Sequence, residues 1–215
     1  MDVTLPISLT PKSLDDLHAR LQACGDLIVL RGEGDVFCHG LELRAWDHDG
    51  LVERFVDCIR ALRCGPPAIA FVDGTARGAG VGLLAACDRV VGTPRADLAL
   101  TELYFGLTPS AIWPLLCERA SPARLRWAAM TGHNLDAEAA QGLGLVDEVV
   151  ADFGAVARYE RALRRTSREA TTLLKRATAP IGAVSVGAAR TRVRLKDPEV
   201  QDRIARYLEG DTPWR

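Results

Sequence analysis

Two glycine-rich segments are the part of this sequence whose residue types and spacing could carry out chemistry. Arg31–Gly40 (RGEGDVFCHG) and Asp73–Gly82 (DGTARGAGVG) each follow a short apolar run typical of a buried strand. Glycine lets backbone N–H groups approach a ligand closely, and a helix N-terminus adds the positive end of its dipole. Two N–H groups aimed at one thioester oxygen would stabilise an enolate or a tetrahedral oxyanion, each by about 3–4 kcal/mol in the transition state. On these residues alone, the interpretation that the glycines only turn the chain is favoured.

Nucleotide binding is a second use of glycine-rich loops, and the spacing here disfavours it. After Gly78 and Gly80, the dinucleotide-binding pattern requires a third glycine at position 83, where Leu83 stands. The phosphate-binding loop of nucleotide triphosphatases requires Gly-Lys followed by Ser or Thr, which this segment lacks. The segment is therefore predicted to present backbone donors to a ligand other than a nucleotide.

Metal and disulfide chemistry is not indicated by the cysteines and histidines. The six cysteines form neither a CxxC pair nor a Cys/His cluster, so we expect reduced thiols and no zinc. Asp47, His48 and Asp49 are consecutive and cannot readily converge on one ion, which favours a polar loop. His18 and His133 are expected at the surface. The site is therefore predicted to hold no metal.

Bulk composition bounds the class of protein. The chain has 215 residues, 48% of them hydrophobic, which is enough for one domain with a substantial core. The net charge of −1 argues against binding nucleic acid through global charge. No apolar run approaches the ~18 residues that a membrane span needs, and the first residues lack the layout of a signal peptide. We expect a cytoplasmic protein that binds neither membrane nor nucleic acid.

The elements that must position the glycine-rich segments alternate along the chain. Apolar runs predict buried strands over residues 27–30, 68–72, 89–91 and 146–150, and residues 3–9 could supply one more. Helical spacing predicts helices over residues 51–64, 111–119, 122–131 and 137–143, a short one from Gly82 to Cys87, and one over 13–24 with Ser13 as its N-cap. Strands alternating with helices predict an α/β fold.

The last quarter of the chain differs in composition from the rest. Residues 156–196 contain eleven Arg or Lys and two Glu, although the whole chain is nearly neutral. This segment predicts a helical, basic subdomain on an acidic body. Its positive charge could bind an acidic carrier protein, since complementary potentials speed the encounter of two proteins. The alternative is that the segment is simply a solvated helical face.

Four motifs in a fixed order resemble the crotonase (enoyl-CoA hydratase/isomerase) superfamily. The first resembles F-C-x-G-x-D-L, the second P-x-I-A-x-V-x-G-x-x-x-G-G-G, the third F-x-x-P-E-x-x-x-G-x-x-P, and the fourth a T-G…G-L-V-D-x-V stretch. They stand at Phe37–Leu43, Ala68–Asp88, Leu98–Pro109 and Thr131–Val149. The resemblance covers about residues 27–150. It implies repeated ββα units in a spiral over residues 1–154, a helical oligomerisation or lid region over 155–215, and a homotrimer or a dimer of trimers.

The resemblance also implies a site. The oxyanion-hole N–H groups fall on Leu41 and Ala79, where Ala79 replaces the usual middle glycine of the motif. The second of the two glutamates of enoyl-CoA hydratases falls on Glu102, which is expected to be catalytic, although a carboxylate satisfied by nearby amides at a helix N-terminus is the alternative. The first falls on Gly82. The substrate is also expected to contact Gly40, Gly78, Gly80 and Gly82. It could further contact His39 and Tyr104. The alternatives are that His39 points to solvent and that Tyr104 packs in the core.

A single catalytic glutamate suits the removal of water better than its addition. The sequence is similar to the crotonase dehydratases of polyketide β-branching, which convert 3-hydroxy-3-methylglutaryl on an acyl carrier protein to 3-methylglutaconyl. The resemblance therefore implies no cofactor beyond the phosphopantetheine of a carrier protein or of CoA, which Arg77 could meet. Two alternatives stay open: a hydratase or isomerase of free acyl-CoA, and an accessory subunit that stimulates a partner enzyme. The accessory role is favoured by the absence of the first glutamate, since Gly82 stands at its position, and by the small number of residues before Leu27.

Overall fold

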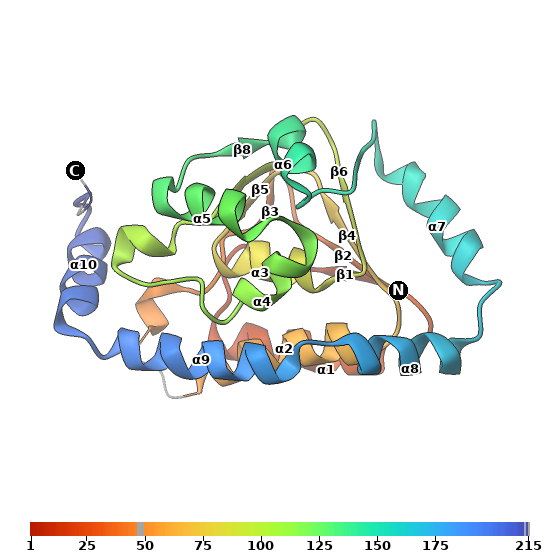
Figure 1. The fold of residues 1–215 in the computed structure, drawn as a ribbon, viewed down its shortest axis with the longest axis horizontal. Coiled ribbons are helices and arrows are strands. Elements are labelled where there is room, and N and C mark those ends of the chain that lie inside the picture. Colours follow the sequence, from red (N-terminus) through yellow and green to blue (C-terminus); the bar gives the residue numbers. More distant parts are fainter. Residues whose placement is uncertain (47–49, 213, 215) are drawn as a thin grey trace.

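Two β-sheets of mainly parallel strands form the centre of the computed structural model, which describes residues 1–46, 50–212 and 214 (Figure 1). The expected polar loop at residues 47–49 lies outside the described residues. The larger sheet has the order β1-β2-β4-β6-β9 and is parallel throughout. Its strands are Asp2–Thr4, Ile28–Arg31, Ala68–Val72, Arg89–Gly92 and Glu148–Val149.

The smaller sheet is the element that the sequence patterns did not predict. It has the order β3-β5-β7-β8, and its strands are Val36–Cys38, Thr75–Arg77, Asp97–Ala99 and Leu135–Asp136. These strands have two or three residues each, too few for an alternating or continuous apolar pattern to be recognised. The prediction of a loop throughout residues 31–40 was therefore wrong at β3.

Successive passes of the chain repeat the same unit. A strand of the larger sheet is followed by a strand of the smaller sheet and then by a helix, as in β2–β3–α2 and β4–β5–α3. This confirms the expected crotonase-like ββα architecture. The α-helices that precede the C-terminal region are α1 to α6, with bounds Pro11–Ala23, Leu51–Cys64, Ala79–Ala86, Trp113–Arg119, Pro122–Thr131 and Ala137–Leu143.

Helix α1 begins before the predicted residue. Thr10 is the N-cap, and its Oγ1 accepts from the Ser13 amide at 3.1 Å, while the Ser13 Oγ accepts from the Thr10 amide at 2.8 Å. The prediction of Ser13 as the N-cap was therefore wrong, because Ser13 is the reciprocal member of a capping box. Pro11 begins the helix, where its missing N–H costs nothing.

The C-terminal residues form four helices, α7 to α10, with bounds Val156–Leu163, Arg168–Thr178, Ile181–Leu195 and Pro198–Leu208. Helices α8 and α9 run one after the other along the side of the molecule that α1 and α2 form (Figure 1). Helix α9 also packs against α4, and α10 packs against the short 3₁₀ helix Glu102–Phe105, named η2. The C-terminal helices therefore extend from the edge of the larger sheet to the neighbourhood of Glu102.

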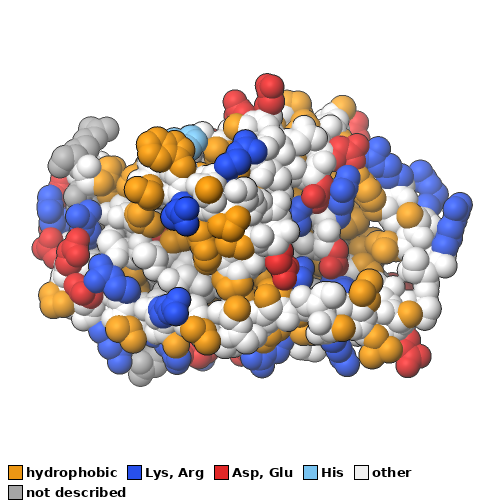
Figure 2. Space-filling model, in the orientation of Figure 1, with side chains coloured by type: hydrophobic (Ala, Val, Ile, Leu, Met, Phe, Trp, Pro, Cys, Tyr) orange, Lys and Arg blue, Asp and Glu red, His pale blue; other side chains and the backbone are white. Residues whose placement is uncertain are grey.

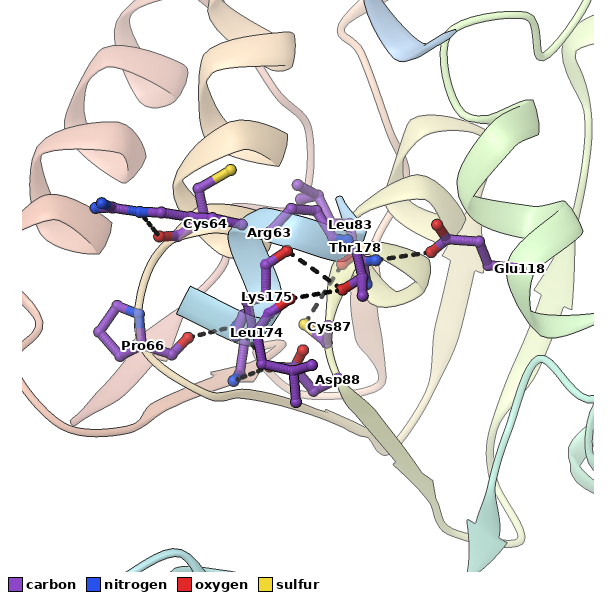
Figure 3. A network of polar contacts seen from close by, with 12 residues as sticks. Arg63, Cys64, Pro66, Leu83, Cys87, Asp88, Glu118, Leu174, Lys175 and Thr178 are labelled. Carbon is purple, nitrogen blue, oxygen red and sulfur yellow. Dashed lines mark hydrogen bonds and ion pairs between the residues drawn. The ribbon is translucent and has the colours of Figure 1, made fainter. Parts of the chain in front are cut away.

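Helix α8 is fixed to the body through a buried lysine (Figure 3). Lys175 is 7% exposed, and its Nζ donates to the Pro66 carbonyl at 2.6 Å and to Asp88 Oδ2 at 2.5 Å. The same Asp88 oxygen accepts from the Ala68 amide at the start of β4. The lysine thus connects α8 to the two segments that lead into the neighbouring strands β4 and β6.

Candidate active site

The two glycine-rich segments lie against each other at the ends of β3 and β5. Gly40 has φ +85°, and a Cβ atom there would lie 2.9 Å from the Arg77 carbonyl oxygen and 3.0 Å from the Ala79 nitrogen. A Cβ atom at Gly80 would lie 2.2 Å from the Cys38 carbonyl oxygen. Only glycine permits this approach. The fold therefore brings the segment after β3 to the N-terminus of α3.

Two backbone N–H groups are left available at this junction. The Gly40 carbonyl accepts from the Leu9 amide, and the Glu42 amide donates to the Leu9 carbonyl, so the amide of Leu41 between them faces away from that pairing. Ala79 is the first residue of α3, where an amide has no partner within the helix. Leu41 and Ala79 both line one cavity, and this is the arrangement that an oxyanion hole requires.

The cavity measures about 130 Å³ and its lining is mainly apolar. Its walls come from both glycine-rich segments, from α2, from η2 and the loop that follows it, and from α9. The lining residues are His39, Leu41, Leu43, Val52, Phe55, Gly78, Ala79, Thr101, Glu102, Phe105, Leu107, Thr108, Pro109, Ala111, Ile112 and Thr191.

Glu102 brings a carboxyl group into this cavity. The residue as a whole is partly exposed, but its Oε2 atom is buried and has no hydrogen-bond partner within the described chain. Burial raises the pKa of Glu102 to about 7, against a smaller lowering by its own backbone N–H. A carboxyl group poised near neutral pH can accept and return a proton. The unpaired oxygen also argues against the alternative of a carboxylate satisfied by nearby amides.

His39 lies at the exposed edge of the cavity. Its Nε2 is 2.8 Å from Thr75 Oγ1, and its own amide donates to the Ile7 carbonyl. Burial lowers the pKa of His39, and the charge of Arg77 lowers it further. Arg77 itself pairs with Asp97 at 3.0 Å and does not line the cavity. At neutral pH the imidazole is therefore a neutral hydrogen-bonding group.

Gly82 and Tyr104 lie outside the cavity lining. A Cβ atom at Gly82 would lie 2.3 Å from Ile112 Cγ2 and 3.2 Å from Phe55 Cζ, so lining side chains fill the space that a glutamate would need. The Tyr104 hydroxyl donates to the carbonyl of Gly132 at 2.9 Å, and its ring stacks on Trp214 at 4.9 Å. Tyr104, a residue of η2, thus packs between the end of α5 and the C-terminal residues, and its placement gives no support to the expected role in substrate binding.

Several lining residues were missed by the sequence analysis. The sequence could have indicated Thr101, since it stands where the family motif has proline beside the glutamate. Nothing in the sequence could have indicated Thr191, because it lies on α9, about ninety positions from Glu102 along the chain. In the described part of the chain, no cluster of three or more His, Cys, Asp or Glu side chains could hold a metal ion. The same part contains no helix long and apolar enough to cross a membrane.

Comparisons with known proteins show which family the chain resembles. The chain is 26% identical to the bacillaene synthase dehydratase PksH of Bacillus subtilis, over 87% of this chain and 79% of that one. It is 30% identical to the enoyl-CoA hydratase AFT6-1 of Alternaria alternata, but over 58% of this chain and only 43% of that one. A crystal structure of the Bacillus subtilis PksH protein is similar with a TM-score of 0.87, at 21% identity, covering 97% of this chain and 92% of that one. The model of the enoyl-CoA hydratase/isomerase family matches residues 7–198, and the chain belongs to this family.

Proposed function

We propose that this enzyme is a dehydratase that removes water from a 3-hydroxyacyl thioester. Membership of the family assigns it to the carbon–oxygen lyases of the enoyl-CoA hydratase type. The observation that carries the finer proposal is the single buried carboxyl group of Glu102 beside the two free N–H groups. No second carboxyl group lines the cavity in the described part of the chain. One carboxyl group is enough for elimination, because it can take one proton and return it.

The proposed reaction proceeds through an enolate. The thioester oxygen accepts hydrogen bonds from the amides of Leu41 and Ala79, which stabilise the negative charge that develops on it. The Glu102 carboxylate removes the α-proton, and the electron pair of that bond is delocalised onto the thioester oxygen. The Cβ–O bond then breaks as the Cα–Cβ double bond forms. Glu102 returns its proton to the departing oxygen, so that water leaves and the carboxylate is regenerated. General acid–base catalysis of this kind contributes roughly 10²–10⁴-fold.

As the substrate we propose 3-hydroxy-3-methylglutaryl on an acyl carrier protein, giving 3-methylglutaconyl. Two observations support it: the relative PksH is named a dehydratase of bacillaene synthase, and the C-terminal helices are rich in arginine. Thr191 places α9 at the cavity, and the exposed Arg190 next to it would meet an acidic carrier protein there, whereas Arg192 pairs with Glu53. The phosphopantetheine of the carrier is the only prosthetic group in this proposal. Location in the cytoplasm belongs to the same proposal.

A homotrimer or a dimer of trimers is the proposed assembly. Helix α5 exposes Trp127 by 65% and Met130 by 63%, and α8 and α9 also expose large apolar side chains. Figure 2 shows hydrophobic side chains at the surface over α5 and along α9. Contact with a second copy would cover such side chains.

The lining of the cavity also favours a second candidate function. No Lys or Arg is among the described lining residues, so the distal carboxylate of a 3-hydroxy-3-methylglutaryl group would find no cation inside, and His39 is the only basic side chain at the described rim. An uncharged acyl group fits such a lining without this difficulty. A hydratase or isomerase of acyl-CoA is therefore the alternative activity.

The experiment that tests the proposal compares carriers. The purified protein is incubated with 3-hydroxy-3-methylglutaryl on an acyl carrier protein and on CoA, and with 3-hydroxybutyryl-CoA, and loss of water is followed by intact mass. Glu102→Gln is expected to abolish the reaction, whereas Glu138→Gln, an exposed carboxyl on α6, is expected to leave it unchanged. No loss of water from the carrier-bound substrate would overturn the proposed substrate. Stimulation of a partner enzyme that survives in Glu102→Gln would establish the accessory role instead.

A further inference from the structure

Three threonines line the cavity, and one of them has a hydroxyl group without an internal partner. Thr108 Oγ1 lies 2.6 Å from Ser110 Oγ, and Thr191 Oγ1 donates to the Gly187 carbonyl at 3.2 Å. Within the described residues, the Thr101 hydroxyl makes no hydrogen bond, and it does not cap η2, although Thr101 is the N-cap residue of that helix. The Thr101 hydroxyl is therefore the one of the three that is free to bind a ligand.

The Thr101 hydroxyl lies on the same side of the cavity as the catalytic carboxyl group. Thr101 Oγ1 is 3.7 Å and Glu102 Oε1 is 3.6 Å from one point, the position that a Cβ atom of Gly78 would take. Gly78 directly precedes Ala79, whose amide belongs to the proposed oxyanion hole. A thioester oxygen held by Ala79 would therefore place the α- and β-carbons within reach of both side chains.

Among the described residues, the side chains beside Gly82 of α3 offer no hydrogen bond to a departing oxygen. Ile112 and Phe55 fill the space beside Gly82, where a second carboxyl group stands in the two-glutamate enzymes that this sequence resembles. A hydroxyl group that leaves as water needs hydrogen-bond donors, because charge develops on its oxygen as the Cβ–O bond breaks. Glu102 supplies the proton, and a hydrogen-bond donor elsewhere in the cavity would further stabilise the charge on the departing oxygen.

We propose that the Thr101 hydroxyl donates a hydrogen bond to the β-oxygen of the substrate and thereby assists its departure. This inference rests on the proposed dehydratase function. The Cα–H and Cβ–O bonds break and the Cα–Cβ double bond forms. The proton that leaves with the oxygen is the one that Glu102 took from the α-carbon, and Thr101 keeps its own proton throughout. Thr101 is thus a catalytic residue for the elimination step and has no part in forming the enolate.

Two reactions separate this role from a structural one. Dehydration of the 3-hydroxy-3-methylglutaryl thioester requires departure of the β-oxygen. Exchange of the α-proton of a 3-methylglutaryl thioester with deuterated water requires only the enolate, because that acyl group has no β-hydroxyl. Thr101→Val keeps the shape of the side chain and removes the donor, and Thr101→Ser keeps the donor. Thr178→Val, on the exposed side of α8, is the matched control.

Thr101→Val is expected to lower kcat for dehydration about 10- to 100-fold, the effect of losing one strong hydrogen bond, while α-proton exchange stays within about twofold. Thr101→Ser is expected to restore most of the dehydration rate. Unchanged dehydration in Thr101→Val would overturn the inference, and so would an equal loss in both reactions. If the wild-type protein exchanges the α-proton but dehydrates none of the 3-hydroxyacyl thioesters, the proposed function itself is wrong.

Discussion

At the scale of single residues, the protonation state of Glu102 governs the proposed chemistry. Burial raises the pKa of its carboxyl group to about 7, and removal of an α-proton requires the ionised form. We therefore expect kcat/KM for dehydration to rise with pH and to level off above a midpoint of about 7. A series of initial rates from pH 5.5 to 8.5 measures this midpoint. A flat profile over that range would contradict it.

The same pKa has a consequence for stability. The folded-state pKa of Glu102, about 7, lies above the ordinary value of 4.5, so the folded state favours the protonated form. The stability that Glu102 contributes is complete below pH 4.5 and is lost as the pH rises through 7. Glu102→Gln should therefore gain stability relative to the wild type at pH 8.5, by up to about 3 kcal/mol. Melting curves at pH 5 and 8.5 test this, and an equal difference at both pH values would exclude it.

Gly82 is fixed by packing. Because a Cβ atom there would lie 2.3 Å from Ile112 Cγ2, Gly82→Ala should cost about 1–3 kcal/mol of unfolding free energy. Gly142, near the end of α6, is the control, since a Cβ atom there meets nothing within 4 Å. Gly142→Ala should be neutral or stabilising by about 0.5–1 kcal/mol. Urea unfolding of both variants gives the comparison, and a fully stable Gly82→Ala would show that the cavity wall can move.

At the scale of elements, one buried cation fixes α8 to the central strands. Lys175 donates to Asp88 and to the Pro66 carbonyl (Figure 3). Lys175→Met keeps the apolar stem but leaves both acceptors without the lysine, and we expect a loss of about 1–3 kcal/mol. Arg176→Met, next along the helix, removes only an exposed bond to the Cys64 carbonyl and should cost less than about 1 kcal/mol. Equal losses in urea unfolding would argue against this role of Lys175.

At the scale of the whole molecule, the C-terminal helices complete the cavity and leave another face apolar. Thr191 of α9 lines the cavity, while α5 exposes Trp127 and Met130. If these side chains lie between copies of the chain, the protein should sediment with a mass of three or six times 23.3 kDa. Trp127→Glu should lower the sedimenting mass toward that of the monomer. Ala162→Glu, an equally charged change on α7, whose described residues include no exposed large apolar side chain, should leave the assembly intact. A monomeric wild type at micromolar concentration would overturn the proposed trimer.

The sequence by itself determined the elements whose signal is local. Continuous apolar runs predicted the strand over residues 68–72, and helical spacing predicted the helices over 51–64, 122–131 and 137–143, all with the bounds that the structure has. The order of four motifs identified the fold family. Each of these patterns comes from residues that are close together in the sequence, so it can be recognised without knowing how the chain folds.

Only the tertiary structure decided what surrounds the proposed catalytic groups. The smaller sheet is built from strands too short to have a pattern of their own, and the cavity combines residues from α2, η2 and α9. Contacts between distant segments decide whether Tyr104 faces the cavity and whether Ile112 fills the space beside Gly82. They also decide whether the Glu102 carboxyl group is buried from solvent. The pKa of Glu102 is set by that burial, and burial is a property of the packed chain.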